Sequence, residues 1–219
     1  MTPTDASRAA PPADSATLAA TAVLTLASAS PRRSQLLRQI GVPHVVRPAD
    51  VDESRREGER PRDYALRVAA DKAEAGWRAA GGTGAVLAAD TAVAVDDALY
   101  AKPRDRADCV RILQALSGRT HEVLTAIALR HAGGLATALQ VSRVTFRALS
   151  PEECERYWAT GEPADKAGAY AIQGLGAVFA TRLEGSFSGV MGLPLAETAA
   201  LLAAAGIPCW QRPAATDQG

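Results

Sequence analysis

The residues with the clearest capacity for chemistry lie in the segment 28–34, where three serines and two arginines surround a proline. An apolar run precedes this segment and a helical pattern follows it, which predicts a strand, a tight turn and a helix. Pro31 falls at the first helical position, where its missing N–H costs nothing, and Ser30 falls at the N-cap. Arg32 and Arg33 then lie in the first turn, where their charge opposes the helix dipole.

An anion bound at this turn would account for the two unfavourably placed cations. The free N–H groups of a helix start, the hydroxyls of Ser28 and Ser30 and two guanidinium groups would converge on the same oxygens. Alternatively, both arginines are solvated surface charge and no ligand is involved. The segment alone leaves the two interpretations open.

Two carboxylates are candidates for acid–base or metal chemistry. Asp90 follows the apolar run 85–89, and a carboxylate at the end of a buried strand needs a partner. It is either a structural residue bonded to the next turn, or a metal ligand or general base at the rim of the sheet. Glu53 lies in an acidic cluster that by default is a solvated loop. Its functional interpretation is a second carboxylate ligand for a divalent cation, since a magnesium ion that bridges phosphates usually binds one or two carboxylates.

Two lysines and a glutamine complete the set of candidates. Lys72 lies in a predicted helix and Lys102 directly precedes Pro103, and singly each suits a surface lysine. Together with the two arginines, they provide enough cations for a triphosphate. Gln173 stands in a long glycine-bearing loop, where its amide either reads the edge of a base or bonds its own loop backbone.

The composition is that of an ordinary globular protein, with 47% hydrophobic and 22% charged residues among 219. Basic and acidic residues are balanced at 24 each, so no global basic field indicates nucleic acid or an anionic membrane as a partner. No apolar run reaches the length that spans a bilayer. The three cysteines are widely separated, which is typical of reduced thiols and predicts a cytoplasmic location.

The chain is predicted to hold one domain, at residues 21–208, between two extensions. Residues 1–20 are rich in Ala, Pro, Thr and Asp and are expected to form a disordered extension. They are not expected to be a signal peptide, because Arg8 is the only basic residue before the apolar stretch. Residues 209–219 are expected to form a tail.

Apolar patterns predict the elements that must position these residues. Strands and helices alternate early and strands predominate in the middle, which predicts an α/β fold with a mixed sheet flanked by helices. The irregular segment 162–174 is long enough to be functional or disordered. Strands are expected at 23–27, 42–46, 85–89 with an extension at 93–95, 121–130, 135–147 and 177–183, and helices at 31–40, 62–78, 106–116, 151–160 and 193–205.

Several short motifs, taken together and in order, resemble the Maf-type nucleoside triphosphate pyrophosphatases. The resemblance covers roughly residues 23–205, and this ordered set is much more specific than any single match. It implies a two-lobed, Maf/ITPase-like α/β fold with a cleft between the lobes, often as a homodimer. The motifs lie at residues 26–33, 89–91, 102–103, 117–121, 165–170 and 185–195.

The resemblance also implies an activity and roles for particular residues. It implies an enzyme that uses a divalent cation, Mg²⁺ or Mn²⁺, to split a nucleoside triphosphate into the monophosphate and pyrophosphate. By similarity, Asp90 is the proton acceptor that activates water, and Glu53 with Asp90 holds the metal. The residues expected by similarity to grip the phosphates are Ser28, Arg33, Lys72 and Lys102.

Three further positions indicate a branch of the family. Arg32, Thr91 and Gln173 resemble the dTTP/UTP pyrophosphatases, which remove unwanted or modified pyrimidine nucleotides. The branch acting on 7-methylated GTP typically has Trp, Gln and Glu at these positions. Two other functions stay open at this point. A nucleotide-binding regulator of septum formation would need the phosphate site but not both carboxylates, and a phosphatase of a small ester would release inorganic phosphate.

Overall fold

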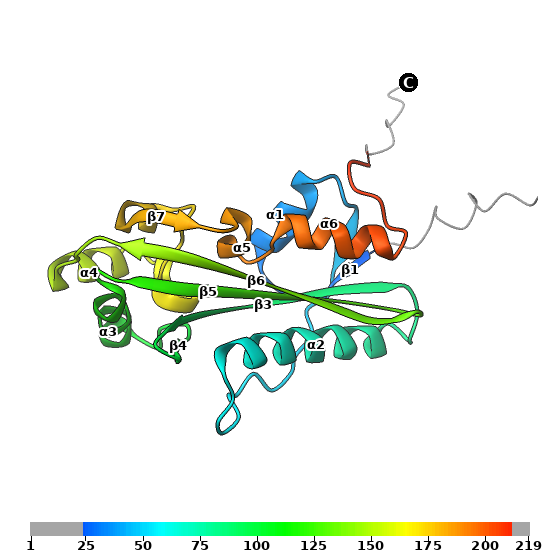
Figure 1. Cartoon of the computed structure of the whole chain (residues 1–219), viewed down its shortest axis with the longest axis horizontal. Helices are drawn as coiled ribbons and strands as arrows, with labels where there is room; N and C mark the ends of the chain where they lie inside the picture. The colour runs from blue at the N-terminus through cyan, green and yellow to red at the C-terminus, as the bar shows by residue number, and fades with distance from the viewer. Residues whose placement is uncertain (1–23, 212–219) are drawn as a thin grey trace, which may run out of the picture.

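The computed structural model describes residues 24–211, which form one mixed sheet with helices on both faces (Figure 1). The expected extension at residues 1–20 and residues 212–219 of the expected tail lie outside the described residues, so the domain division stays a prediction. The strands of the seven-stranded sheet are β1 (Leu24–Leu26), β2 (His44–Val46), β3 (Ala85–Val95), β4 (Ala98–Tyr100), β5 (Thr120–His131), β6 (Gly134–Phe146) and β7 (Ala180–Glu184).

The strand order is β2-β1-β3-β5-β6-β7, and β4 pairs with β3. β1 runs parallel to β2 and β3, whereas the remaining pairs are antiparallel. The predicted mixed α/β sheet is therefore confirmed. The helices are α1 (Pro31–Gln39), α2 (Pro61–Ala79), α3 (Arg106–Leu116), α4 (Pro151–Trp158), α5 (Phe187–Met191) and α6 (Leu195–Ala204), with 3₁₀ turns η1 (Glu162–Asp165), η2 (Ala167–Ala169) and η3 (Leu175–Phe179).

Two groups of helices cover the two ends of the sheet (Figure 1). At one end α2 packs on one face, while α1 and α6 pack on the other. At the other end, α3 and α4 enclose a separate core with the turns that follow them. The long strands β3, β5 and β6 run through both ends, so the two halves share one continuous sheet.

Alternation along β3 decides which side chains meet which helix. Ala88 and Ala92 pack against α2, whereas Leu87 and Ala89 pack against α1 and α6. Because successive side chains of a strand point to opposite faces, Asp90 faces α2 and the next residue faces α1 and α5. The two polar neighbours in this strand therefore serve opposite faces of the sheet.

The prediction that Asp90 and Thr91 end a strand is wrong. β3 continues to Val95, because β5 pairs with it as far as Ala94. What ends near Asp90 is the neighbouring strand, since the pairing of β1 with β3 stops at Leu87.

This early end of β1 leaves a gap along one edge of β3. The next strand on that edge is β4, whose pairing with β3 begins at Val93. Between Leu87 and Val93, β3 has no strand neighbour on this side among the described residues. Side chains from both faces of the sheet can reach the opening here, which resembles the crevices that hold ligands in open α/β sheets.

The region after α4 departs from its predicted secondary structure in two places. The expected strand at 177–183 begins only at Ala180, because residues before it form the turn η3. The short helix α5 was also not predicted; Ser186 caps it by accepting a hydrogen bond from Gly189 N–H. Gly192 ends α5 with a left-handed backbone (φ 115°), and α6 begins three residues later, at Leu195.

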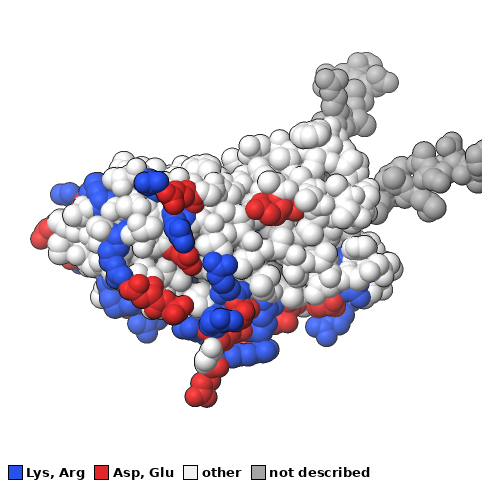
Figure 2. Space-filling model, viewed as in Figure 1, with Lys and Arg blue, Asp and Glu red and all other residues white. Residues whose placement is uncertain are grey.

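Within residues 24–211, no helix combines the length and the apolar character that crossing a membrane requires. Cys109, Cys154 and Cys209 are all free thiols. Lys and Arg side chains are interspersed with Asp and Glu on the face drawn in Figure 2, mainly over its left and lower parts, and the surface over α6 is largely uncharged. This face therefore presents no large field of one sign.

Candidate active site

A cavity of about 560 Å³ opens at the gap in the edge of β3. All nine residues singled out from the sequence lie on its wall: the four expected phosphate ligands, the two carboxylates and the three selectivity residues. They come from the β1–α1 turn, the first turn of α1, the loop after β2, α2, β3, the segment before α3 and the loop after η2. The fold therefore brings together residues that the sequence spreads over almost 150 positions.

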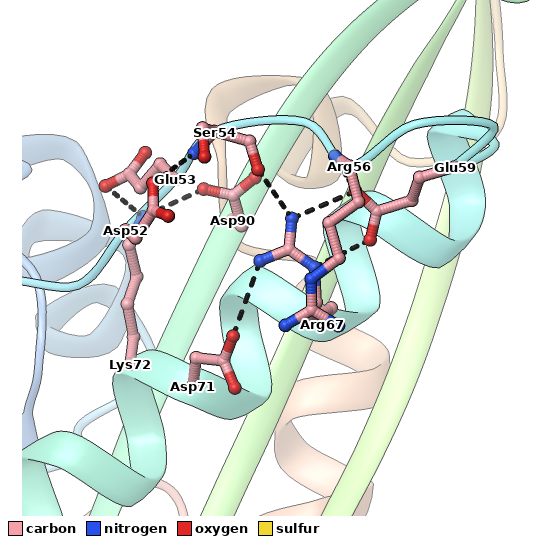
Figure 3. Close-up of polar contacts among 9 residues, drawn as sticks. All are labelled: Asp52, Glu53, Ser54, Arg56, Glu59, Arg67, Asp71, Lys72 and Asp90. Carbon is pink, nitrogen blue, oxygen red and sulfur yellow. Dashed lines mark hydrogen bonds and ion pairs between the residues drawn. The ribbon is translucent and has the colours of Figure 1, made fainter.

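Lys72 joins the two carboxylates in the floor of the cavity (Figure 3). Its Nζ lies 2.9 Å from Asp90 Oδ1 and 2.9 Å from Glu53 Oε1. Asp90 is 6% exposed and Lys72 is 8% exposed, whereas the Glu53 side chain is half exposed. The even-numbered face of β3 turns Asp90 toward α2, which supplies Lys72. The buried carboxylate therefore has a cationic partner, as its burial demands.

The two carboxylates fit a divalent cation that arrives with a substrate. They already converge on one positive charge, the Nζ of Lys72, which lies 2.9 Å from one oxygen of each carboxylate. No group of three or more His, Cys, Asp or Glu side chains in residues 24–211 is arranged to hold a metal. Mg²⁺ usually takes one or two carboxylates and completes its shell with phosphate oxygens and waters. The donor set suits Mg²⁺ or Mn²⁺ shared with a triphosphate.

Arg33 extends from the first turn of α1 into the cavity and is held by neutral groups. Its Nε donates to Gly192 O (2.8 Å), Nη1 donates to Ser28 Oγ (2.9 Å), and Nη2 donates to Thr91 Oγ1 (3.2 Å). Among the described residues, no carboxylate forms an ion pair with it. Burial lowers the pKa of Arg33, while the nearby charge of Asp90 opposes this effect. A partly buried guanidinium without a carboxylate partner favours binding of an anion.

The N-terminus of α1 adds to this anion site. Pro31 begins the helix and Ser30 occupies the N-cap position, as predicted. The Ser30 hydroxyl, however, makes no capping hydrogen bond. The Ser30 N–H instead bonds to Ser28 Oγ at 3.2 Å, within the turn itself.

Two threonine hydroxyls, linked by a hydrogen bond, connect Arg33 to the backbone of α5. Thr125 Oγ1 donates to Gly189 O (2.7 Å), so its hydrogen is used and it accepts from Thr91 Oγ1 (3.1 Å). Thr91 Oγ1 in turn accepts from Arg33. The Thr91 hydroxyl is therefore engaged with an arginine and a threonine of the protein. Sequence reasoning missed Thr125, for which the only signal was a polar residue inside an apolar strand.

Five further polar residues of the cavity wall lie at its entrance, and some of them are exposed. Arg32 Nη1 lies 3.7 Å from Asp165 Oδ2, and Asp165 also pairs with Lys166, which lines the cavity and which sequence reasoning left without a role. Burial opposes ionisation of Asp165, but these two cations outweigh it and lower its pKa. In the described part of the chain, the exposed side chains of Lys102 and Gln173 make no hydrogen bond or ion pair.

The loop that carries Gln173 is held by one carboxylate. Glu162 accepts hydrogen bonds from the backbone N–H of Leu175 and of Gly176, at 3.0 Å each. The Tyr157 hydroxyl donates to the same carboxylate at 2.7 Å. The segment expected to be irregular is therefore a series of tight turns fixed to α4, which holds Gln173 at the wall of the cavity.

The wall of the cavity also includes Tyr170, whose hydroxyl lies 2.9 Å from Nε2 of the buried His121. Burial lowers the pKa of His121 from 6.5 to about 4. Between these values the unfolded chain binds a proton that the native protein does not, so stability is lost as the pH falls below 6.5. At pH 5 this loss amounts to about 2 kcal/mol.

Urea unfolding at pH 7 and pH 5 tests this expectation. The His121→Gln variant should lose about 2 kcal/mol less stability between the two pH values than the unchanged protein. His131→Gln, at the end of β5 next to the β5–β6 turn, is the matched control and should behave like the unchanged protein. Equal losses in the protein with and without His121 would show that this imidazole does not carry the acid sensitivity.

Comparison with known proteins agrees with the motifs. The family model described as Maf-like protein matches residues 23–205. A dTTP/UTP pyrophosphatase of Methylococcus capsulatus is 54% identical over 184 residues, which cover 84% of this chain and 91% of that protein. A dTTP/UTP pyrophosphatase of Anaeromyxobacter sp. is 52% identical over 202 residues, which cover 90% of this chain and 96% of that protein.

A more remote likeness is to the solved structure of a nucleoside-triphosphatase/dITP/XTP pyrophosphatase from Mycobacterium abscessus. It covers 63% of this chain and 92% of that chain, with 19% sequence identity and a TM-score of 0.38, which is too low to carry an argument. The family match, in contrast, includes every residue of the cavity wall described above. The chain belongs to the Maf family.

Proposed function

We propose that this protein hydrolyses dTTP and UTP to the monophosphate and pyrophosphate, with a divalent metal and with Asp90 as general base. The observation that carries the proposal is the convergence of Asp90 and Glu53 on one cation, beside the unpaired guanidinium of Arg33, within one cavity. The curated relatives that are 52–54% identical are named as dTTP/UTP pyrophosphatases, which supports the choice of substrate.

The triphosphate is bound by the cations around the β1–α1 turn. Arg33 offers a planar donor fork whose direction is set by three hydrogen bonds, and the Ser28 hydroxyl lies beside it. Lys102, whose exposed side chain also lines the cavity, adds a further cation for the phosphates. Neutralising this charge matters because phosphoryl transfer is driven mainly by positioning and electrostatic stabilisation.

Asp90 is placed to accept the proton of the attacking water. The water oxygen forms a bond to the α-phosphorus, the bond from that phosphorus to the bridging oxygen breaks, and pyrophosphate leaves. Lys72 holds the Asp90 carboxylate in place by its hydrogen bond to Oδ1. A divalent cation held by Glu53 and Asp90 would supply charge neutralisation at the phosphates.

Selectivity is assigned to the mouth of the cavity. The amide of Gln173 can pair a donor and an acceptor with the edge that uracil and thymine share, and its loop is fixed by Glu162. Arg32 reaches the same region from α1. For Thr91 the contacts favour an indirect contribution through Arg33, since its hydroxyl accepts a hydrogen bond from that side chain.

The proposal also includes a location and an oligomeric state. The free thiols are compatible with the reducing cytoplasm. We expect the protein to be a homodimer and not to bind nucleic acid.

A substrate panel with Mg²⁺ or Mn²⁺ tests the reaction and its selectivity. We expect pyrophosphate, and no inorganic phosphate, from dTTP and UTP, and much slower release from CTP, GTP and 7-methyl-GTP. Preference for 7-methyl-GTP would overturn the selectivity while keeping the reaction class. Release of inorganic phosphate would indicate a phosphatase, and nucleotide binding without turnover would indicate a regulator.

A further inference from the structure

The loop that carries Glu53 has no regular secondary structure from residue 47 to residue 60, yet its carboxylate must reach Lys72. More than half of the residues in this loop are exposed, and part of it projects from the body of the protein (Figure 1). The contact between Glu53 and Lys72 alone is a half-exposed ion pair, and such pairs contribute little to holding a chain in place. Another contact must define the position of this loop.

Arg67 on α2 provides that contact (Figure 3). Its Nε and Nη2 donate to the two carboxylate oxygens of Glu59, at 2.6 and 2.9 Å. Nη2 also donates to the backbone carbonyl of Ser54 at 2.9 Å. The guanidinium thus bonds the residue that directly follows Glu53 and a second residue five positions further along the same loop.

The pair of Arg67 and Glu59 is unusually well shielded for a loop contact. Their side chains are 13% and 9% exposed. The hydrogen bond from Arg67 holds the pKa of Glu59 down at about 2, so the pair stays ionised over the working pH range. Glu59 also accepts a hydrogen bond from Arg56 N–H at 3.0 Å. A bidentate pair of this kind fixes direction as well as distance.

Arg67 and Lys72 both belong to α2. The helix therefore contacts the loop twice, through Arg67 at Ser54 and Glu59 and through Lys72 at the Glu53 carboxylate. The Ser54 carbonyl is fixed by Arg67, and one residue earlier the Glu53 carboxylate meets Lys72. We propose that Arg67, through Glu59 and the Ser54 carbonyl, is the positioning residue that presents Glu53 to the metal and substrate. The metal in this inference rests on the proposed function, whereas the position of the loop rests on the hydrogen bonds of Arg67 alone.

The geometric half is tested by hydrogen exchange of residues 50–58 without any ligand. Arg67→Met and Arg67→Lys should both raise exchange in this loop by about tenfold or more, because a lysine cannot form the bidentate and carbonyl contacts together. Arg60→Met is the matched control, since Arg60 lies at the N-cap of α2 and its side chain, within residues 24–211, pairs only with the exposed Asp63. Unchanged exchange in both Arg67 variants would overturn the proposal.

The functional half is tested by Mn²⁺ binding, measured by electron paramagnetic resonance in the presence of α,β-imido-dUTP, which cannot be cleaved. Loss of a positioning residue typically weakens metal affinity about 10- to 100-fold, and we expect this for Arg67→Lys and Glu59→Gln. In a Glu53→Gln background, the same substitutions should add almost nothing. An equal further loss in that background would show that Arg67 acts elsewhere and would overturn the proposal.

The two readouts separate this inference from the function on which it rests. If the unchanged protein binds no Mn²⁺ with the analogue, the metal in the proposed function is wrong, whereas loop exchange still decides whether Arg67 positions the loop. If loop exchange rises but Mn²⁺ affinity does not fall, Arg67 holds the loop without presenting Glu53, and the positioning role is refuted.

Discussion

Replacing Asp90 by Asn is expected to lower kcat by about a thousandfold while the protein stays folded. Asn keeps the shape of the side chain but cannot accept a proton from water, and a general base contributes about 10²- to 10⁴-fold. The amide oxygen can still accept the hydrogen bond from Lys72 Nζ, which now lies 2.9 Å from Asp90 Oδ1. Lys72 also keeps Glu53 as its second partner, so no buried charge is left alone.

Steady-state pyrophosphate release from dTTP measures the effect, with thermal unfolding to check the fold. Asp96→Asn is the control, because Asp96 lies in the exposed turn after β3 and pairs with Arg119 at the surface. Activity of Asp96→Asn should match the unchanged protein. If Asp90→Asn turned over dTTP at an undiminished rate, Asp90 would not be the base, and another group of the cavity would have to take that role.

The elements of the fold could be predicted largely because their patterns are local. Pro31 marks the start of α1, and the apolar spacing of 106–116 matches α3 without correction. The end of β3 could not be predicted in this way. It depends on how far β5 follows it, which is a tertiary contact between segments some 30 residues apart. The same holds for η3, which a carboxylate 13 residues earlier stabilises.

The candidate residues were recognisable by type and motif, but the contacts that orient them were not. Arg67 and Glu59 are two charges in a segment full of charges, and such residues in a sequence indicate a solvated surface. Only the fold shows that this pair is shielded while Glu53 is half exposed. Thr125 could not be recognised either, because a single threonine in an apolar strand is not a functional signal. Its role follows only from the hydrogen bond between its hydroxyl and that of Thr91.

Replacing Arg33 by Lys is expected to lower kcat/KM for dTTP about 10²- to 10³-fold, although the charge is kept. The guanidinium makes three hydrogen bonds in fixed directions, to Gly192, Ser28 and Thr91, and these aim its charge into the cavity. A lysine ammonium is a point charge on a flexible stem and cannot reproduce this fork. Some stability should be lost as well, because the lysine ammonium keeps the charge in this site but cannot make the three hydrogen bonds together.

Arg38→Lys is the matched control, because Arg38 lies on the same helix, in its exposed last turn. Its kcat/KM and its midpoint of thermal unfolding should both stay at the values of the unchanged protein. A lysine at position 33 that retained activity within about threefold would mean that simple charge is sufficient there. The hydroxyl chain through Thr91 and Thr125 would then have no part in catalysis. A large loss of activity with an unchanged unfolding midpoint would instead show that the directions of the Arg33 hydrogen bonds serve the substrate rather than the fold.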